Sequence, residues 1–268
     1  MVNVIDLHSH ILPGVDDGSP DLETSLAMAR MAVADGIQVM AATPHFMPGM
    51  YDNEAGDIRR RVDQFNQNLT EAGIDLAVVT GSDAHIRPDF LPLVRDGQIL
   101  SLNGSRYVLF EPPHNIMPQR MEDMLFNIVM LGFVPILTHP ERLKWIEQHY
   151  DVVQRLGDSG VWMQITGGSL TGRFGRRPQY WAERMLNEGR IHILATDAHN
   201  LTSRPPILSD AVRVAEAAVG MDEARNLVLV RPVNILDNEP AEKSPPIAVS
   251  AAPVQAPKTL WRRLFGGE

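Results

Sequence analysis

The sequence predicts an α/β fold built on a parallel sheet, arranged either as an incomplete barrel or as an open doubly wound sheet. Short apolar runs recur along the chain with little alternation, which is typical of parallel strands buried on both faces. Stretches with helical spacing lie between these runs, so that strand and helix alternate about seven times. No Gly-rich dinucleotide fingerprint follows any of the runs, which argues against a Rossmann fold.

The expected strands are the apolar runs themselves. They cover residues 4–8, 39–43, 76–80, 107–111, 134–138, 162–166 and 191–196. The helical stretches between them are expected to serve as crossover connections, which parallel strands require.

The clearest helix is predicted over residues 20–35. Ser19 can cap this helix, Pro20 suits its first position, and Gly36 follows its end. Its apolar residues fall on one stripe, namely Leu22, Leu26, Ala29 and Val33. Weaker helical patterns cover residues 55–72, 121–131, 177–188, 206–219 and 222–230.

The composition limits the functions that the chain can have. A net charge of −9 offers no basic footprint for nucleic acid. No apolar stretch approaches the roughly 20 residues of a membrane span, and no signal peptide is recognised, so a cytoplasmic protein is expected. The chain contains no cysteine, which excludes disulfides, thiolate metal sites and cysteine nucleophiles. Any metal must therefore be held by histidine and carboxylate.

The C-terminal segment differs from the rest of the chain. A folded domain is expected over residues 1–237, followed by a tail over residues 238–268. Residues 238–257 are rich in Pro and Ala and lack any period, which is typical of a flexible linker. The chain ends in KTLWRRLFGGE, a basic and aromatic cluster. This end is either a disordered tail or a docking peptide for a partner or for the anionic inner face of a membrane.

Side chains of the types that ligate metals follow six of the seven predicted strands. They are His8, His10 and Asp17 after the first strand, then His45, Asp83, Glu111 and His139, and finally Asp197 and His199 after the last strand. Because the carboxyl ends of parallel strands meet on one face, these side chains are expected to lie together. A single histidine or aspartate at a strand end has ordinary structural explanations, but the whole set does not.

A metal centre explains this set of side chains. Burying so many titratable groups together without a cation would cost several kcal/mol for each. Residues two apart on a strand point to the same side, so His8 and His10 can bind one ion, and Asp197 and His199 repeat this spacing. The nitrogen and oxygen ligands are too many for one tetrahedral ion and suit two or three ions. A set without sulfur favours Mn, Fe or Zn over Cu(I) or Ca.

Several short motifs are similar to those of a known family. The blocks DLHSHILPGVDDG, TPH, GSD, FE, THPER and TDAHN, the last followed by SRPP, resemble the PHP (polymerase and histidinol phosphatase) superfamily. More narrowly, they resemble the bacterial metal-dependent protein-tyrosine phosphatases of capsule and exopolysaccharide synthesis, over residues 3–236. The resemblance implies a distorted (β/α)7 TIM-like barrel. It also implies three ions, usually Mn²⁺, held by the residues named above, and a phosphate held by Arg142 and Arg204.

The predicted ligand set has alternatives at three places. The family has Gly-x-Glu after the third strand, whereas this chain has Gly81-Ser82-Asp83, with a side chain one methylene shorter. His85, two residues further on, is therefore a further candidate ligand. Asp17 is preferred to Asp16 because Asp17 directly precedes the glycine in the motif.

The resemblance implies hydrolysis of a phosphomonoester by water activated between two metal ions. Tyrosine is the expected leaving group, and the implied substrate is a phosphotyrosine protein, specifically a membrane-linked bacterial tyrosine kinase that controls polysaccharide export. One alternative is a PHP phosphoesterase for a small molecule such as histidinol phosphate. An amidohydrolase would need a bridging lysine, and Lys144 does not end a strand. The alternative of another class is a non-catalytic metal-holding regulatory scaffold. The oligomeric state is left open.

Overall fold

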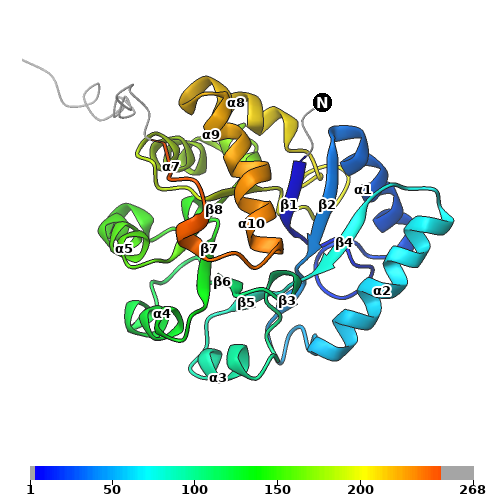
Figure 1. The fold of residues 1–268 in the computed structure, drawn as a ribbon, viewed down its shortest axis with the longest axis horizontal. Coiled ribbons are helices and arrows are strands. Elements are labelled where there is room, and N and C mark those ends of the chain that lie inside the picture. The colour runs from blue at the N-terminus through cyan, green and yellow to red at the C-terminus, as the bar shows by residue number, and fades with distance from the viewer. Residues whose placement is uncertain (1–3, 249–268) are drawn as a thin grey trace, which may run out of the picture.

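The computed structural model describes residues 4–248, in which every strand pairing is parallel (Figure 1). One sheet contains β1 (Val4–Ser9), β2 (Ile37–Ala42) and β4 (Ala77–Thr80). The second sheet contains, in order, β3 (His45–Phe46), β5 (Asp83–His85), β6 (Tyr107–Glu111), β7 (Val134–Thr138), β8 (Trp162–Thr166) and β9 (Ile193–Ala195). The strands therefore follow one another around the molecule in chain order.

The two sheets share two chain segments, each of which is interrupted near its middle. Thr43 and Pro44 separate β2 from β3, and a proline cannot donate to a sheet ladder. Gly81 lies between β4 and β5, where a Cβ atom would come within 2.9 Å of Thr43 Cγ2. Counting each interrupted segment once gives the seven strands that the sequence predicts.

Backbone hydrogen bonds join the first strand segment to the last. Asp197 N donates to His8 O at 2.8 Å, and His10 N donates to Ala198 O at 2.8 Å. The prediction of an α/β fold with a distorted seven-stranded barrel is confirmed. The predicted bounds of β6, β7 and β8 agree with the structure, whereas β2 begins earlier, at Ile37, and β9 covers only the middle of its predicted run.

Helices surround the strands (Figure 1). The helices over predicted stretches are α1 (Leu22–Asp35), α2 (Ala55–Glu71), α4 (Met121–Met130), α7 (Arg176–Asn187) and α8 (Ser209–Val219). The stretch predicted at 222–230 divides into α9 (Met221–Arg225) and a π-helical segment (Asn226–Val230), which continues into α10 (Arg231–Leu236). Helices that were not predicted are α3 (Phe90–Arg95), α5 (Ile146–Asp158) and α6 (Gly167–Leu170).

The start of α1 corrects the sequence prediction. Asp21, rather than Ser19, is the N-cap, because its side chain accepts a hydrogen bond from Thr24 N at 2.8 Å. Pro20 therefore lies outside the helix. Gly36 ends the helix with φ 99°, as predicted.

The buried face of α1 also differs from the predicted stripe. The residues that it buries are Ser25, Met28, Ala29 and Ala32. Leu22, the first residue of the predicted stripe, is 39% exposed. Of the predicted stripe, Ala29 is buried, and Leu26 and Val33 are partly buried against the core.

Apolar side chains fill both faces of the strands. Within the barrel, Ile5 and Leu7 of β1 belong to the same cluster as Ile235 of α10. In Figure 1, α10 lies across the strands in front of the viewer. Arg231, at the start of α10, donates to His192 O just before β9. The amino-terminal end of the barrel is thus closed by α10, and the carboxyl ends of the strands lie at the opposite end.

The chain beyond α10 stays in contact with the barrel as far as residue 246. Arg106 N donates to Asn238 Oδ1 at 2.9 Å, and Tyr107 donates from its hydroxyl to Glu239 O at 2.9 Å. Arg231 donates to the carbonyls of residues 245 and 246. The expected flexible linker therefore does not begin at residue 238, although the domain boundary at 237/238 stays a prediction. The basic and aromatic end, residues 258–268, lies outside the described residues.

Within residues 4–248, no helix combines the length and the apolar character that crossing a membrane would require.

Candidate metal centre

The carboxyl ends of the strands and the loops that follow them bring all of the predicted ligands together. They fall into five overlapping groups, in each of which the ligand atoms lie within 4.8 Å of one another. The groups are His10, Asp17, His45 and His199; His8, His10 and Asp197; His8, Asp83 and His139; His45, His85 and Glu111; and Glu111, His114 and His139. Their role as metal ligands stays a prediction, and the geometry below describes what they can do.

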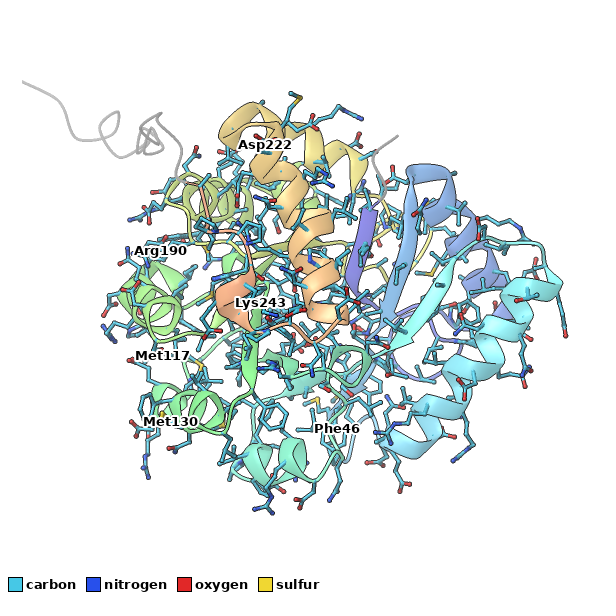
Figure 2. All side chains as sticks on the ribbon, viewed as in Figure 1. Phe46, Met117, Met130, Arg190, Asp222 and Lys243 are labelled. Carbon is cyan, nitrogen blue, oxygen red and sulfur yellow. The ribbon has the colours of Figure 1, made fainter. Side chains whose placement is uncertain are left out.

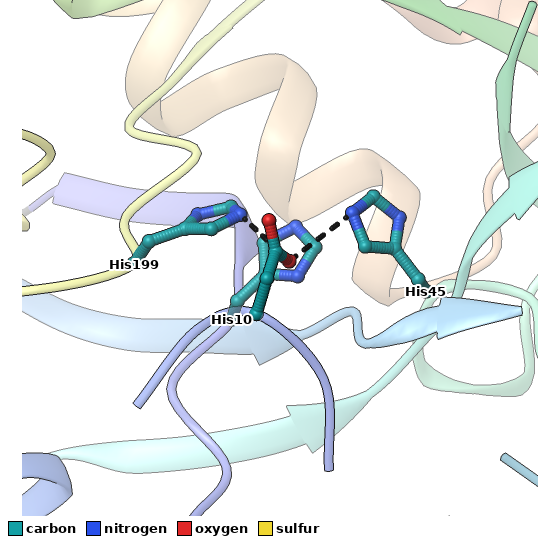
Figure 3. A group of neighbouring side chains, drawn as sticks. His10, His45 and His199 are labelled. Atoms are coloured by element: carbon teal, nitrogen blue, oxygen red, sulfur yellow. Dashed lines mark ion pairs between the residues drawn. The ribbon is translucent and has the colours of Figure 1, made fainter. Parts of the chain in front are cut away.

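The first group lies at the mouth of the site. Asp17 Oδ1 lies 3.4 Å from Nε2 of His45 and 3.4 Å from Nε2 of His199, and the ring centroids of His10 and His199 are 3.8 Å apart (Figure 3). The Asp17 side chain is 48% exposed, so solvent reaches this group.

Two further groups share His8 and lie deeper. His8 Nε2 lies 3.4 Å from His10 Nε2, 3.4 Å from Asp197 Oδ1 and 3.5 Å from Asp83 Oδ2. His139 completes the group that contains Asp83. All of these side chains are buried. Four ligand atoms thus surround one imidazole nitrogen.

Glu111 at the end of β6 joins the remaining two groups. Its Oε2 lies 2.7 Å from His85 Nε2 and 3.5 Å from His45 Nδ1, and its Oε1 lies 3.0 Å from His114 Nε2 and 3.5 Å from His139 Nε2. His85 was a further candidate in the sequence, and the structure places it at the site. His114 was not predicted, although it follows Glu111 by three residues in the loop after β6. Examining whole loops, rather than strand ends alone, would have found it.

The side chains of Asp16 and Asp17 make different contacts. Asp16 Oδ2 lies 2.7 Å from His10 Nδ1, on the side of the ring away from the group, and Asp16 also accepts from Gly18 N and His45 N. Asp16 therefore orients His10, while Asp17 faces the ligand atoms. Gly18 is needed here because a Cβ atom would lie 2.3 Å from His10 O.

Gln164 of β8 supports His8 in the same way, with Oε1 at 2.9 Å from His8 Nδ1. An outer partner of this kind fixes the orientation of an imidazole and turns its other nitrogen toward a metal.

Two of the site residues have a left-handed backbone. His139 follows β7 with φ 34°, and Asp197 follows β9 with φ 52°. Such conformations cost about 1–3 kcal/mol for residues other than glycine and persist where surrounding contacts enforce them. They turn the chain sharply at the strand ends, so that both side chains enter the groups described above.

The unpaired polar atoms of the site fit divalent cations. Within residues 4–248, the buried atoms without a hydrogen-bond partner include both carboxylate oxygens of Asp83, His45 Nδ1 and His199 Nε2. A buried carboxylate with neither oxygen bonded is costly in a folded protein. Cations would satisfy these atoms, and a nitrogen and oxygen donor set suits Mn, Fe or Zn.

The side chains of the site also shift one another's pKa values. Burial lowers the pKa of His139 well below its ordinary value, and the positive charge of Arg142 lowers it further. Burial and the neighbouring His10 lower the pKa of His199 to about 4. Both imidazoles are thus neutral, which is the form that binds a metal. Burial would also lower the pKa of His10, but Asp16 and Asp197 raise it to about 10.

Arg142 and Arg204 lie at the edge of the same site. Both donate to Asp197 Oδ2, Arg204 from Nη2 at 2.5 Å. Burial would raise the pKa of Asp197, but His8 and Arg204 hold it well below its ordinary value. Both guanidinium groups therefore already point toward the carboxylate that faces His8 and His10. Their predicted role in holding phosphate stays a proposal.

Two charged residues close to Arg142 in the sequence, Glu141 and Lys144, belong to none of the groups described above. Glu141, between His139 and Arg142, is buried, and its Oε1 accepts from Thr166 N at 3.0 Å and from Ser169 Oγ at 2.7 Å. Lys144 is exposed and belongs to none of the groups. The bridging lysine of an amidohydrolase therefore has no counterpart at this position.

Comparison with known proteins places the chain among enzymes of capsule synthesis. A family model described as "Capsular polysaccharide synthesis, CpsB/CapC" matches residues 4–237. Tyrosine-protein phosphatase YwqE of Bacillus subtilis is 34% identical, over 98% of this chain and 99% of the relative. Tyrosine-protein phosphatase CpsB of Streptococcus pneumoniae is 30% identical, over 87% of this chain and 98% of the relative.

A solved structure agrees with these sequence matches. It is one of the crystal structures of YwqE from B. subtilis and CpsB from S. pneumoniae, described as unique metal-dependent tyrosine phosphatases. It superposes with a TM-score of 0.86 at 34% identity, covering 92% of this chain and 99% of that chain.

Proposed function

Because the chain belongs to the CpsB/CapC family of capsular polysaccharide synthesis, we propose that it is a metal-dependent tyrosine-protein phosphatase. The observation that carries the proposal is the convergence of all the predicted ligands into overlapping groups beside two arginines that share one carboxylate. The family match spans all of these residues. Binding of metals and of a phosphoryl group at one place is the minimum that such a hydrolase needs.

The proposed centre holds three ions, with Mn²⁺ preferred and Fe or Zn as alternatives. Its ligands are His8, His10, Asp17, His45, Asp83, Glu111, His139, Asp197 and His199. The overlap of five groups through shared residues such as Glu111 and His8 supports more than one ion. His85 and His114 lie against Glu111 and are further candidates.

The protein's own residues bind and orient the phosphate. Divalent cations at the site would supply Lewis acidity, which lowers the pKa of water and offsets charge on phosphoryl oxygens. Arg142 and Arg204 donate to the same oxygens, since the planar guanidinium fork matches phosphate geometry. Asp16 and Gln164 keep the rings of His10 and His8 in the orientation described above.

The leaving group and the nucleophile follow from the chemistry of the chain. A tyrosine phenolate has a pKa near 10 and departs more readily than an alkoxide, so little protonation is required. The chain has no cysteine to form a phosphocysteine intermediate. Water is therefore the nucleophile in this proposal.

The proposed partner is a phosphotyrosine protein, specifically a membrane-linked bacterial tyrosine kinase that controls polysaccharide export. The names of the relatives, tyrosine-protein phosphatases YwqE and CpsB, support a phosphotyrosine protein as the substrate. We propose that the protein acts in the cytoplasm, at the inner face of the membrane where such a kinase would present its phosphotyrosines.

Arg142→Ala tests the proposal. Removing one preorganised donor to a transition-state oxyanion lowers the rate roughly 10²- to 10³-fold in enzymes. We therefore expect Arg142→Ala to lose phosphotyrosine-peptide hydrolysis by about this factor while keeping its metal content. Arg155→Ala, a surface arginine paired with Glu122 and Asp151, is the matched control.

Two results would overturn the assignment. Equal activity of Arg142→Ala and Arg155→Ala would remove the phosphate role of Arg142. Faster hydrolysis of phosphoserine peptides or of histidinol phosphate than of phosphotyrosine peptides would contradict the tyrosine specificity.

A further inference from the structure

A cavity of about 480 Å³ lies between α3 and α4. Its walls are the loop after β5, α3, and the start of α4 with the residues before it. Six apolar side chains line it, namely Ile86, Pro88, Leu91, Pro118, Met121 and Met124. Its volume lies in the range of about 300–1,000 Å³ that is typical of ligand pockets.

The two loops that form this cavity also carry residues of the metal centre. His85, which contacts Glu111, directly precedes Ile86, and Ile86 N donates to Glu111 O at 3.0 Å. The loop after β6 carries His114 before it reaches Pro118. The loops that follow β5 and β6 therefore contribute both to this cavity and to the metal centre.

Three charged residues line the cavity, namely Arg87, Arg120 and Asp123, and each arginine is paired with a carboxylate. Arg87 donates to both carboxylate oxygens of Asp89, from Nη2 to Oδ2 at 2.8 Å. Arg120 donates from Nε to Asp123 Oδ2 at 3.2 Å. Both arginines at the cavity thus already have a carboxylate partner. A neutral apolar group would contact the lining, and Met124 can adapt to its shape.

We propose that this cavity receives an apolar side chain of the substrate protein, a few residues away from the phosphotyrosine. The inference rests on the proposed function, because it takes the phosphotyrosine to lie at the metal centre. An extended peptide advances about 3.3–3.6 Å per residue, so a side chain within about four positions can reach an adjoining cavity. The site would then select protein substrates by a contact that small phosphate esters do not make.

The experiment uses the full-length protein loaded with Mn²⁺ and two kinds of substrate. One is p-nitrophenyl phosphate, which occupies the metal centre only. The other is a set of phosphotyrosine peptides with a Gly-Ser background, in which a single leucine is placed at each of about four positions on either side. Met124→Trp fills the cavity, and Met130→Trp is the matched control, because Met130 lies on the same helix, is 68% exposed and does not line the cavity (Figure 2).

For the unmodified protein, leucine at one position is expected to raise kcat/KM roughly tenfold, the factor expected when most of a leucine side chain is buried. Met124→Trp is expected to abolish this preference while hydrolysis of p-nitrophenyl phosphate stays within about twofold. Met130→Trp is expected to keep the preference. If Met124→Trp does not fold, Leu91→Trp fills the cavity from its opposite wall.

The outcomes separate the inference from the function on which it rests. Absence of a leucine preference, or its survival in the filled variant, overturns the inference and leaves the phosphatase assignment intact. This result would also be obtained if a second copy of the chain, or its own C-terminal segment, covered the cavity. Absence of hydrolysis of every phosphate ester would overturn both.

Discussion

At the scale of single residues, Asp197 contacts both the histidines and the arginines of the site. Its Oδ1 lies 3.4 Å from His8 and 3.5 Å from His10, whereas its Oδ2 accepts from Arg142 and Arg204. The side chain is buried and its backbone is left-handed. One carboxylate therefore sets the spacing between the histidines proposed to bind metal and the arginines proposed to bind phosphate.

Phe174 supports one of these arginines from the other side. The Arg142 guanidinium lies over the Phe174 ring, 4.7 Å from its centroid. A Cβ atom on Gly168 would lie 2.8 Å from this ring, so glycine leaves the space that the ring occupies. A cation–π contact at a partly exposed site is worth about 0.5–1 kcal/mol.

We expect Phe174→Leu to lower kcat/KM for phosphotyrosine peptides about two- to fivefold, because Arg142 loses its support. Metal content should not change, and Phe174→Tyr should restore activity because it keeps an aromatic face. Phe126→Leu, at a phenylalanine that is 53% exposed on α4, is the control. Equal kcat/KM for Phe174→Leu and the unmodified protein would show that the contact does not position Arg142.

At the scale of elements, the bounds of a strand are predicted correctly when an apolar run ends at a polar residue. The continuous apolar runs of β6, β7 and β8 mark their own limits, and Glu111 and His139 stand at or just after such limits. The sequence predicts less where geometry depends on distant contacts. The helix α5 was not predicted, although its buried residues Ile146, Tyr150 and Val153 follow a helical spacing. His114 was missed because only the residues at or directly after the strand ends were considered, whereas it lies three residues further along the loop after Glu111.

The contact between β8 and the residues before β9 is expected to make the stability of the protein depend on pH. Met163 N donates to His192 Nδ1 at 3.0 Å, and the ring of His192 stacks on Trp162. Burial and the charge of Arg231 lower the pKa of His192 to about 3. Since the unfolded chain takes up this proton near pH 6.5, the contribution of His192 to stability is complete above that pH and is lost as the pH falls toward 3.

His192→Gln keeps a hydrogen-bond acceptor but cannot titrate. We expect the free energy of unfolding to fall less between pH 7 and pH 5 in this variant than in the unmodified protein, by on the order of 1–2 kcal/mol. Urea denaturation at the two pH values measures this difference. Identical pH dependence of the two proteins would show that His192 is not held neutral by its surroundings.

At the scale of the whole molecule, the two ends of the barrel have separate roles. The carboxyl ends of the strands carry the site, while α10 and residues 238–246 cover the amino-terminal end. The order of the strands could be predicted, because alternating strands and helices favour a parallel arrangement in sequence order. The closure between β1 and β9 could not, since it depends on a few backbone hydrogen bonds between residues nearly the full domain apart.

Arg231 holds the amino-terminal end together. It is buried and pairs with both carboxylate oxygens of Glu223, at 2.8 and 3.0 Å, while also donating to the carbonyls of Pro245 and Pro246. Removing one partner of a buried pair leaves an uncompensated charge and costs about 3–5 kcal/mol.

Arg231→Met is therefore expected to lower the free energy of unfolding by about 3–5 kcal/mol, measured by chemical denaturation. The double variant Arg231→Met with Glu223→Leu should lose less than the single variant, because no buried charge then remains. A loss below about 1 kcal/mol in Arg231→Met would contradict this role of the pair.

The central claim is that imidazole and carboxylate groups at the strand ends hold catalytic cations. Its most direct test is the metal content of the purified protein, measured together with phosphotyrosine-peptide hydrolysis before chelation, after chelation and after Mn²⁺ is added back. We expect several ions per chain, loss of activity when they are removed, and recovery of activity with Mn²⁺. A metal-free protein that hydrolyses phosphotyrosine at an undiminished rate would contradict it.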